Sequence, residues 1–88
     1  MIMPRGEGEY VVKALLPLED FNDYFDTGFS TDDVDTVGGL VLNTLGHVPK
    51  RGETVDTGGM RFEILHADSR RVHLMRVRRS PEVVGGEG

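Results

Sequence analysis

The sequence contains no cysteine among its 88 residues. This absence excludes disulfide frameworks, thiolate catalysis, iron–sulfur clusters and zinc sites built on thiolates, and it fits a reducing compartment. Long hydrophobic runs are also absent. The longest apolar run is Ala14–Leu18, far below the roughly 20 residues that cross a bilayer. No secretory signal is readable at Met1–Pro4.

Positive charge is scarce in most of the chain. The net charge is −5, and the stretch from Glu19 to Asp35 carries seven carboxylates with no Lys or Arg. The balance reverses near the end, where five arginines and no carboxylate lie between Arg70 and Arg79. Because phosphate contacts require cationic surface, an acidic chain is a poor nonspecific ligand for nucleic acid. We therefore expect no nucleic-acid partner.

Length and composition predict one small domain rich in loops. Glycine and proline together make up about 18% of the chain, against roughly 12% in average proteins, which favours an α+β domain over a helical bundle. Prolines and glycines punctuate both ends without apolar periodicity. We therefore expect a flexible lead-in over residues 1–8, a folded domain over 9–79 and a flexible tail over 80–88.

Hydrophobic periodicity predicts a strand, two helices and then an antiparallel meander. The expected strands are rich in β-branched and aromatic residues, and the expected helices repeat apolar residues at helical spacing. A bulge near Met75 or Arg76 would bring Val77 into phase with Val72. In chain order the expected elements are a strand over 9–16, a helix over 18–25, an acidic loop over 30–35, a helix over 37–45, and strands over 53–57, 60–67 and 71–79, with a hairpin turn at 58–59.

Two adjacent glycines, Gly38 and Gly39, occupy the first turn of the second helix, after an N-cap at Asp35 or Thr36. Relative to alanine they cost the helix about 2 kcal/mol, so something should offset that cost. One interpretation is an anion site at the helix N-terminus; the favoured one is close packing of another segment against the glycines. Gly46 stands where a left-handed C-cap is needed.

Two clusters of side chains could bind metal ions. Asp32, Asp33 and Asp35 offer the oxygen ligands that Mg²⁺ and Ca²⁺ prefer, although their spacing does not match an EF-hand, and a solvated acidic loop is the alternative. If Ser69 and Arg70 form a two-residue turn, His66 and His73 face each other across a hairpin. Two imidazoles make a weak transition-metal site, and an ordinary surface pair is the alternative. No nucleophile or paired carboxylate is set up for catalysis.

Six segments spread over about residues 9–79 carry a resemblance to a known family. They are Pro17–Asn22 (PLEDFN), Asp35–Val41 (DTVGGLV), Leu45–Pro49 (LGHVP), Arg51–Glu53 (RGE), Phe62–Leu65 (FEIL) and Ala67–Val72 (ADSRRV). Together they resemble the CorC/HlyC transporter-associated domain. Many members have a polar Asp-Gly turn after the first strand, where this chain has Lys13-Ala14-Leu15.

The resemblance implies a small two-layer α+β fold like the smaller part of a PCMH-type FAD-binding domain, without implying flavin binding. It implies a C-terminal module that follows a pair of CBS domains in a longer chain. Proteins of the CorC type are associated with magnesium and cobalt efflux, and the family includes putative haemolysins. It implies no catalytic residue, and it implies structural roles for four glycines: packing at Gly38 and Gly39, a cap at Gly46 and a turn at Gly52.

These observations lead to a functional hypothesis. We expect a non-enzymatic regulatory domain that docks on the CBS pair or on itself, with Arg70, Arg71 and Arg76 as interaction residues. The alternatives are direct sensing of Mg²⁺ or Co²⁺ by the acidic loop and, by fold analogy, binding of FAD or adenine nucleotides. We expect no firmly bound cofactor. We expect a cytoplasmic location, at the inner face of the membrane through the parent protein.

Overall fold

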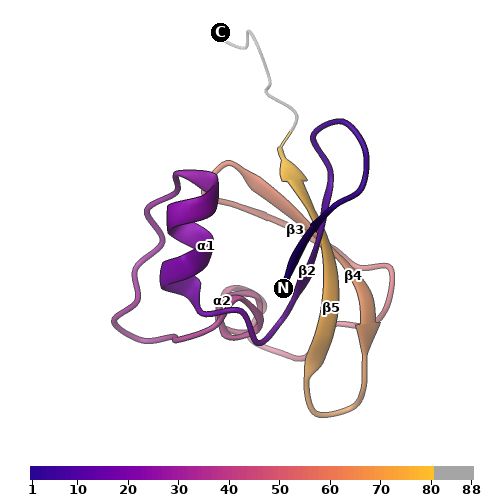
Figure 1. The fold of residues 1–88 in the computed structure, drawn as a ribbon. Coiled ribbons are helices and arrows are strands. Elements are labelled where there is room, and N and C mark those ends of the chain that lie inside the picture. The colour runs from indigo at the N-terminus through magenta and orange to yellow at the C-terminus, as the bar shows by residue number, and fades with distance from the viewer. Residues whose placement is uncertain (81–88) are drawn as a thin grey trace, which may run out of the picture.

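Five strands and two helices make up the part of the chain that the computed structural model describes, residues 1–80 (Figure 1). The strands form one antiparallel sheet in the order β1-β2-β5-β4-β3. This architecture confirms the predicted α+β class, with two helices followed by a meander, but two strands precede the helices where one was predicted. The elements are β1 (Ile2–Pro4), β2 (Tyr10–Lys13), α1 (Leu18–Phe25), α2 (Val37–Leu45), β3 (Thr54–Thr57), β4 (Met60–Ala67) and β5 (Val72–Arg79).

The strand β1 corrects the prediction that residues 1–8 form a flexible lead-in. Ile2 lies opposite Val12 and Pro4 lies opposite Tyr10 in an antiparallel hairpin, and the N–H of Arg5 donates to the carbonyl of Glu9 at 2.8 Å. Gly6 and Gly8 therefore belong to a hairpin turn, and Pro4 ends the strand before it. Pro4 is tolerated because an edge strand does not need every ladder donor. The other predicted end, the tail over 80–88, lies outside the described residues except for Ser80.

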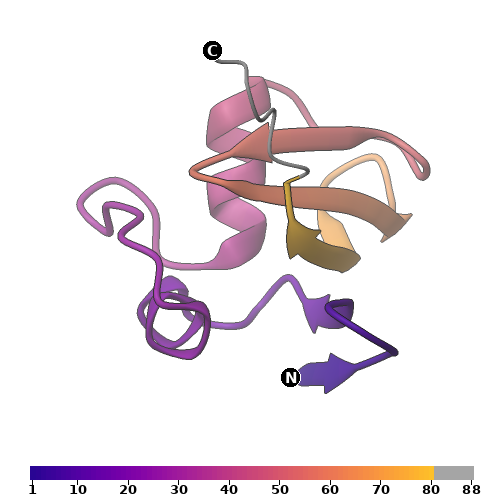
Figure 2. The ribbon, with the colours of Figure 1, turned by 90° about the horizontal axis from the view of Figure 1, so that it is seen from above.

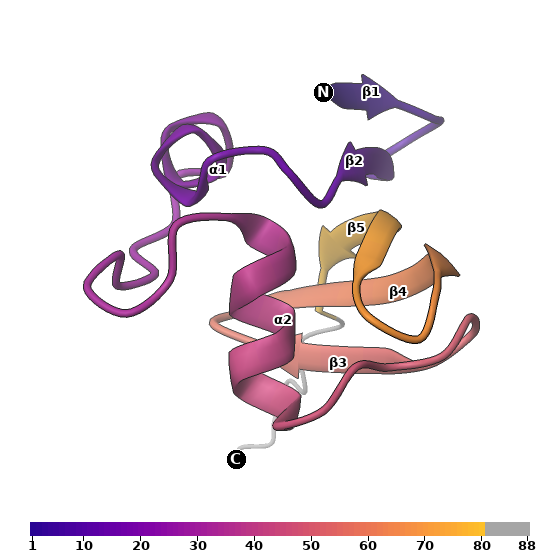
Figure 3. The same cartoon turned by 90° about the horizontal axis from the view of Figure 1, so that it is seen from below.

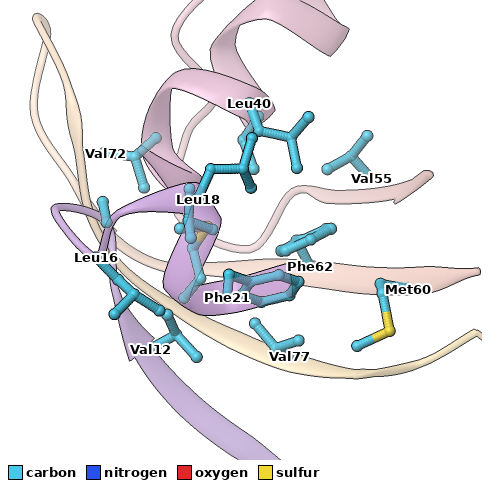
Figure 4. Close-up of a cluster of buried hydrophobic side chains, with 14 of the residues drawn as sticks. Val12, Leu16, Leu18, Phe21, Leu40, Val55, Met60, Phe62, Val72 and Val77 are labelled. Atoms are coloured by element: carbon cyan, nitrogen blue, oxygen red, sulfur yellow. The ribbon is translucent and has the colours of Figure 1, made fainter. Parts of the chain in front are cut away.

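Both helices lie on the same side of the sheet (Figures 2 and 3). The space between helices and sheet is filled by apolar side chains, with Phe21 from α1 and Phe62 from β4 both completely buried (Figure 4). In the described residues no charged or polar side chain is buried. Neither helix has the length and apolar character needed to span a membrane within residues 1–80.

The helix boundaries follow the predicted ones because local signals set them. The acidic residues Glu19 and Asp20 stand in the first turn of α1, where they favour the helix dipole. The N-cap of α2 is Thr36, whose hydroxyl oxygen accepts the N–H of Gly39 at 3.1 Å. The alternative N-cap, Asp35, lies one residue earlier.

The β4–β5 pairing departs from the predicted register. Irregular pairing lies on both sides of His66, which pairs with Leu74 instead of His73. The buried residues of β5 are Val72, Met75 and Val77. The predicted bulge near Met75 or Arg76 is confirmed to within one residue, because the first register shift lies between the Ile64–Met75 and His66–Leu74 pairs. The second shift, between the His66–Leu74 and Ala67–Val72 pairs, lies closer to the hairpin turn.

The long connection between the helices is held by one side chain that the sequence analysis did not single out. The carboxamide of Asn22 donates to the carbonyl of Phe29 at 2.9 Å. Its oxygen accepts the N–H of Phe29 at 3.0 Å and the hydroxyl of Thr27 at 2.8 Å. These bonds close the loop over α1 and place the ring of Phe29 6.0 Å from that of Phe21.

Candidate docking surface

The first turn of α2 lies directly against the segment that joins β2 to α1. The N–H of Gly38 donates to the carbonyl of Ala14 at 2.9 Å, and the N–H of Val37 donates to the carbonyl of Leu16 at 3.0 Å. With the bond from Gly39 to Thr36, the first three N–H groups of the helix are all satisfied within the protein. None of the three is left over for an anion.

Gly38 permits this approach because it has no side chain. A Cβ at this position would lie 2.9 Å from the Cβ of Ala14 and 3.2 Å from its carbonyl oxygen. The N–H of Ala14 in turn donates to the carbonyl of His73 at 3.0 Å. The backbone of Ala14, within the Lys13–Leu15 segment, is therefore hydrogen-bonded to β5 on one side and to α2 on the other.

Gly46 and Gly52 both have left-handed backbone conformations, with φ of 80° and 93°. The N–H of Gly46 donates to the carbonyl of Leu42 at 2.8 Å and ends α2. The N–H of Gly52 donates to the carbonyl of Ile64 at 2.8 Å and ties the α2–β3 connection to β4. Residues other than glycine rarely adopt this backbone conformation.

An open groove of about 590 Å³ runs along the outer side of α2. The helix contributes Gly39, Leu42, Asn43 and Gly46 to it, a spacing that places all four on one face. The opposite wall comes from the acidic loop: Asp33, Val34, Asp35 and Thr36.

A second, smaller hollow of about 120 Å³ adjoins the groove and shares Leu42 with it. Leu15 and Arg71 line this hollow. Leu15 is 68% exposed and Leu42 is 37% exposed, so two large apolar side chains face solvent beside the glycine pair. We call the groove and the hollow together the α2 surface.

The predicted cation ligands lie at the edge of this surface. Asp33 and Asp35 line the groove, and the N–H of Asp32 donates to the hydroxyl of Ser30 at 3.2 Å. In the described part of the chain, no three histidine, aspartate or glutamate side chains come together as a metal ion would require. Cation binding by these aspartates stays a prediction.

The predicted interaction arginines have different surroundings. Arg76 forms an ion pair with Glu63 at 2.7 Å and lies 3.9 Å from Glu9. The guanidinium of Arg79, from the same strand, donates to the carbonyl of Phe25 at 2.6 Å. Arg70 and Arg71 are exposed at the β4–β5 turn. Much of the positive charge of β5 is thus engaged within the fold, and the interaction role of these residues stays a prediction.

Asp68 organises the β4–β5 turn. Its Oδ1 accepts the N–H groups of Arg70 at 2.7 Å and Arg71 at 2.9 Å, and its Oδ2 lies 2.8 Å from Nε2 of His73. The hydrogen bond to His73, followed by the two backbone donors, lowers the pKa of Asp68 well below its ordinary value of 3.8. This carboxylate is therefore ionised throughout the physiological range.

The lowered pKa of Asp68 predicts a pH dependence that NMR can measure. A depressed folded-state pKa contributes stability that is present above the unfolded value near 3.8 and is lost as the pH falls through the folded value. We expect the carboxyl of Asp68 to titrate below 3.8, and His73→Ala to raise its pKa. An unchanged pKa in that variant would mean that the imidazole is not the main cause.

Three comparisons with known proteins place the chain among relatives. A family model described as the transporter associated domain, CorC_HlyC, matches residues 4–81. The "magnesium and cobalt efflux protein CorC" of Salmonella typhimurium is 51% identical over 69 residues, which are 78% of this chain and 24% of that protein. The protein of the same name from Vibrio cholerae is 54% identical over 68 residues, 77% of this chain and 23% of that protein.

Solved structures show the same fold. The putative Mg²⁺ and Co²⁺ transporter (CorC) associated region from Neisseria meningitidis has a TM-score of 0.87 at 40% identity, covering 89% of this chain and 96% of that one. A CorC_HlyC domain from a Xylella fastidiosa hemolysin, in complex with Mg²⁺ and Mn²⁺, has a TM-score of 0.80 at 24% identity, covering 91% of this chain and 98% of that one. The chain spans about a quarter of the length of the curated relatives.

Proposed function

The chain belongs to the CorC/HlyC transporter-associated domain family, and we propose that it is a non-catalytic docking domain of a magnesium and cobalt efflux protein. The family membership confirms the resemblance seen in the sequence. In this proposal the domain binds the CBS pair of its longer parent chain at the cytoplasmic face of the membrane. Docking there biases the state of the transport machinery.

The observation that carries the proposal is the α2 surface. Leu15 and Leu42 expose apolar area beside a groove, and exposed apolar residues gathered at one place are typical of interaction sites. The surface carries charge of both signs, because Asp33 and Asp35 lie on one side and Arg71 on the other. Such an arrangement gives a partner orientation and specificity in addition to affinity.

Regulation by docking requires that the domain contact two states of the parent protein differently. The α2 surface suits this role because it is supported by rigid packing: Gly38 lies against Ala14, and Val37 is completely buried. The α2 surface would thus keep its shape while a partner moved relative to it, so that the contacts would differ between the two states of the partner. Self-association through the same surface is the alternative arrangement.

Replacing Leu42 with glutamate tests the proposal. We expect the variant to bind the isolated CBS pair of the parent protein at least ~10-fold more weakly, because it introduces a charge into an apolar contact. The measurement is a titration of the ¹⁵N-labelled chain with that CBS pair. Met3→Glu is the matched control, since Met3 is 38% exposed on β1 and Leu42 is 37% exposed.

Binding of equal strength by both variants would contradict the proposed surface. No binding by the unmodified chain would contradict docking on the CBS pair. Light scattering at low and high salt examines self-association independently: a monomer in both conditions excludes it, whereas a dimer that Leu42→Glu dissociates would assign the α2 surface to a second copy.

A further inference from the structure

Two histidines lie side by side at the end of the β4–β5 hairpin. The turn of this hairpin contributes Arg71 to the α2 surface, but neither histidine lines that surface. His66 is exposed, whereas Ile64 and Ala67 on either side of it pack against the core. The irregular pairing around His66 interrupts the alternation of the strand. It thereby turns the imidazole of His66 to the outer face, next to His73.

The separation of the two rings matches that of two ligands on one metal ion. Their centroids are 5.0 Å apart and their planes differ by 47°. With metal–nitrogen bonds of about 2.0–2.1 Å and a tetrahedral angle of about 109°, two imidazoles on one ion have centroids roughly 5 Å apart. The separation of the two rings therefore suits chelation of one ion.

Asp68 fixes the tautomer of His73 that a metal ligand requires. Its Oδ1 already accepts two backbone N–H groups, which favours the carboxylate form. An ionised carboxylate can accept hydrogen bonds but cannot donate them, so Nε2 of His73 carries the proton in the 2.8 Å hydrogen bond to Oδ2 of Asp68. The lone pair is then on Nδ1. A carboxylate that holds the N–H of a ligating imidazole is the usual support of histidine–metal bonds.

We propose that His66 and His73 form a two-imidazole site for a divalent transition-metal ion, with Asp68 as a positioning residue. Residues 1–80 contain no group of three metal-binding side chains, so water completes the coordination. Imidazole ligands suit Co²⁺, Ni²⁺ and Zn²⁺, whereas Mg²⁺ requires oxygen ligands. The site thus distinguishes Co²⁺ from Mg²⁺. The positive charges of Arg70 and Arg71 in the same turn oppose a cation and keep the affinity modest.

The test is a titration of the full 88-residue chain, labelled with ¹⁵N, using Co²⁺ for paramagnetic shifts and Zn²⁺ for calorimetry. We expect saturable binding of one ion, with the largest shifts at His66 and His73, unaffected by a large excess of Mg²⁺. His66→Ala and His73→Ala each abolish this binding. Asp68→Asn weakens it by about 10-fold. His47→Ala is the matched control, because His47 is the third histidine of the chain and its imidazole is paired with Glu53 at 3.8 Å.

Three results would overturn the site: no saturable binding below about 1 mM, binding retained in both hairpin variants, or binding lost in His47→Ala. Amide spectra without metal establish that each variant is folded, and His73→Gln replaces His73→Ala if the latter unfolds. Leu42→Glu should bind Co²⁺ normally. The metal site and the docking surface are therefore tested independently.

Discussion

Replacing Phe21 with alanine is expected to lower the free energy of unfolding by about 3–5 kcal/mol, the range for removing a fully buried phenylalanine. Phe21 is completely buried. Its ring centroid lies 4.5 Å from that of Phe25, 5.6 Å from Phe62 and 6.0 Å from Phe29. One side chain thus joins α1, β4 and the loop between the helices.

The effect should be large because the domain is small. At about 0.05–0.15 kcal/mol per residue, a chain of 88 residues has a total stability of roughly 4–13 kcal/mol. A short chain also buries a smaller share of its surface than a large domain. Phe21→Ala therefore removes much of the total and can leave the chain unfolded.

Urea denaturation followed by circular dichroism measures this loss. Tyr24→Ala is the matched control, since Tyr24 lies on the same helix but is 53% exposed. Its edge-on contacts with Tyr10 and Phe25 predict a loss of only about 0.5–1.5 kcal/mol. Equal losses in the two variants would show that Phe21 is not the centre of the core.

Gly38→Ala should also destabilise the domain, by about 1–3 kcal/mol, the usual cost of overpacking. At an unhindered position in a helix the same exchange would stabilise by about 1 kcal/mol, so the sign of the effect is diagnostic. The new Cβ would lie 2.9 Å from the Cβ of Ala14. Neither atom belongs to a flexible side chain, so the β2–α1 connection and α2 must separate.

A double-mutant cycle with Ala14→Gly identifies the clash. Ala14→Gly alone removes a nearly buried methyl group and should destabilise, but in the Gly38→Ala background it should recover part of the loss. The two sites are then coupled by at least 0.5 kcal/mol, as expected for residues in contact. Additive losses would contradict the close approach.

Gly28→Ala is the control for the exchange itself. Gly28 has no positive φ and nothing within 4 Å of its Cβ position. Alanine there should leave the free energy of unfolding unchanged or raise it by about 0.4–1 kcal/mol, since it restricts the unfolded chain. If Gly28→Ala destabilised the domain as much as Gly38→Ala, the loss would come from exchanging glycine for alanine in general and not from the contact with Ala14.

The boundaries of the helices could be predicted from short-range signals in the sequence. Pro17 precedes α1, Thr36 caps α2 and Gly46 ends it, and each of these signals acts over only a few residues. The positions of α1, α2 and β4 could therefore be predicted from the sequence alone. The family motif could be recognised in the same way, because it is a spacing of residue types along the chain.

The β1 strand and the β4–β5 register illustrate what local signals cannot decide. Ile2 pairs with Val12 across a turn whose glycines resemble those of a flexible segment. The shift that pairs His66 with Leu74 follows from the need to bury Val72, Met75 and Val77 together. Such pairings depend on which residues become neighbours in the sheet, and that is settled only when the strands pack.

By itself, the sequence determined the α+β class and the two helices with their caps, because these depend on short-range backbone preferences. It also determined the family motif and the positions of the glycines, because these are read directly along the chain. Tertiary structure alone decided what the glycines meet and which arginines are engaged. The closeness of His66 and His73 was already predicted from the hairpin, but tertiary structure also decided that Leu15 and Leu42 share a surface and that Asp68 is hydrogen-bonded to His73. These are contacts between segments distant in the chain or displaced by irregular pairing, and only packing of the whole domain sets their distances.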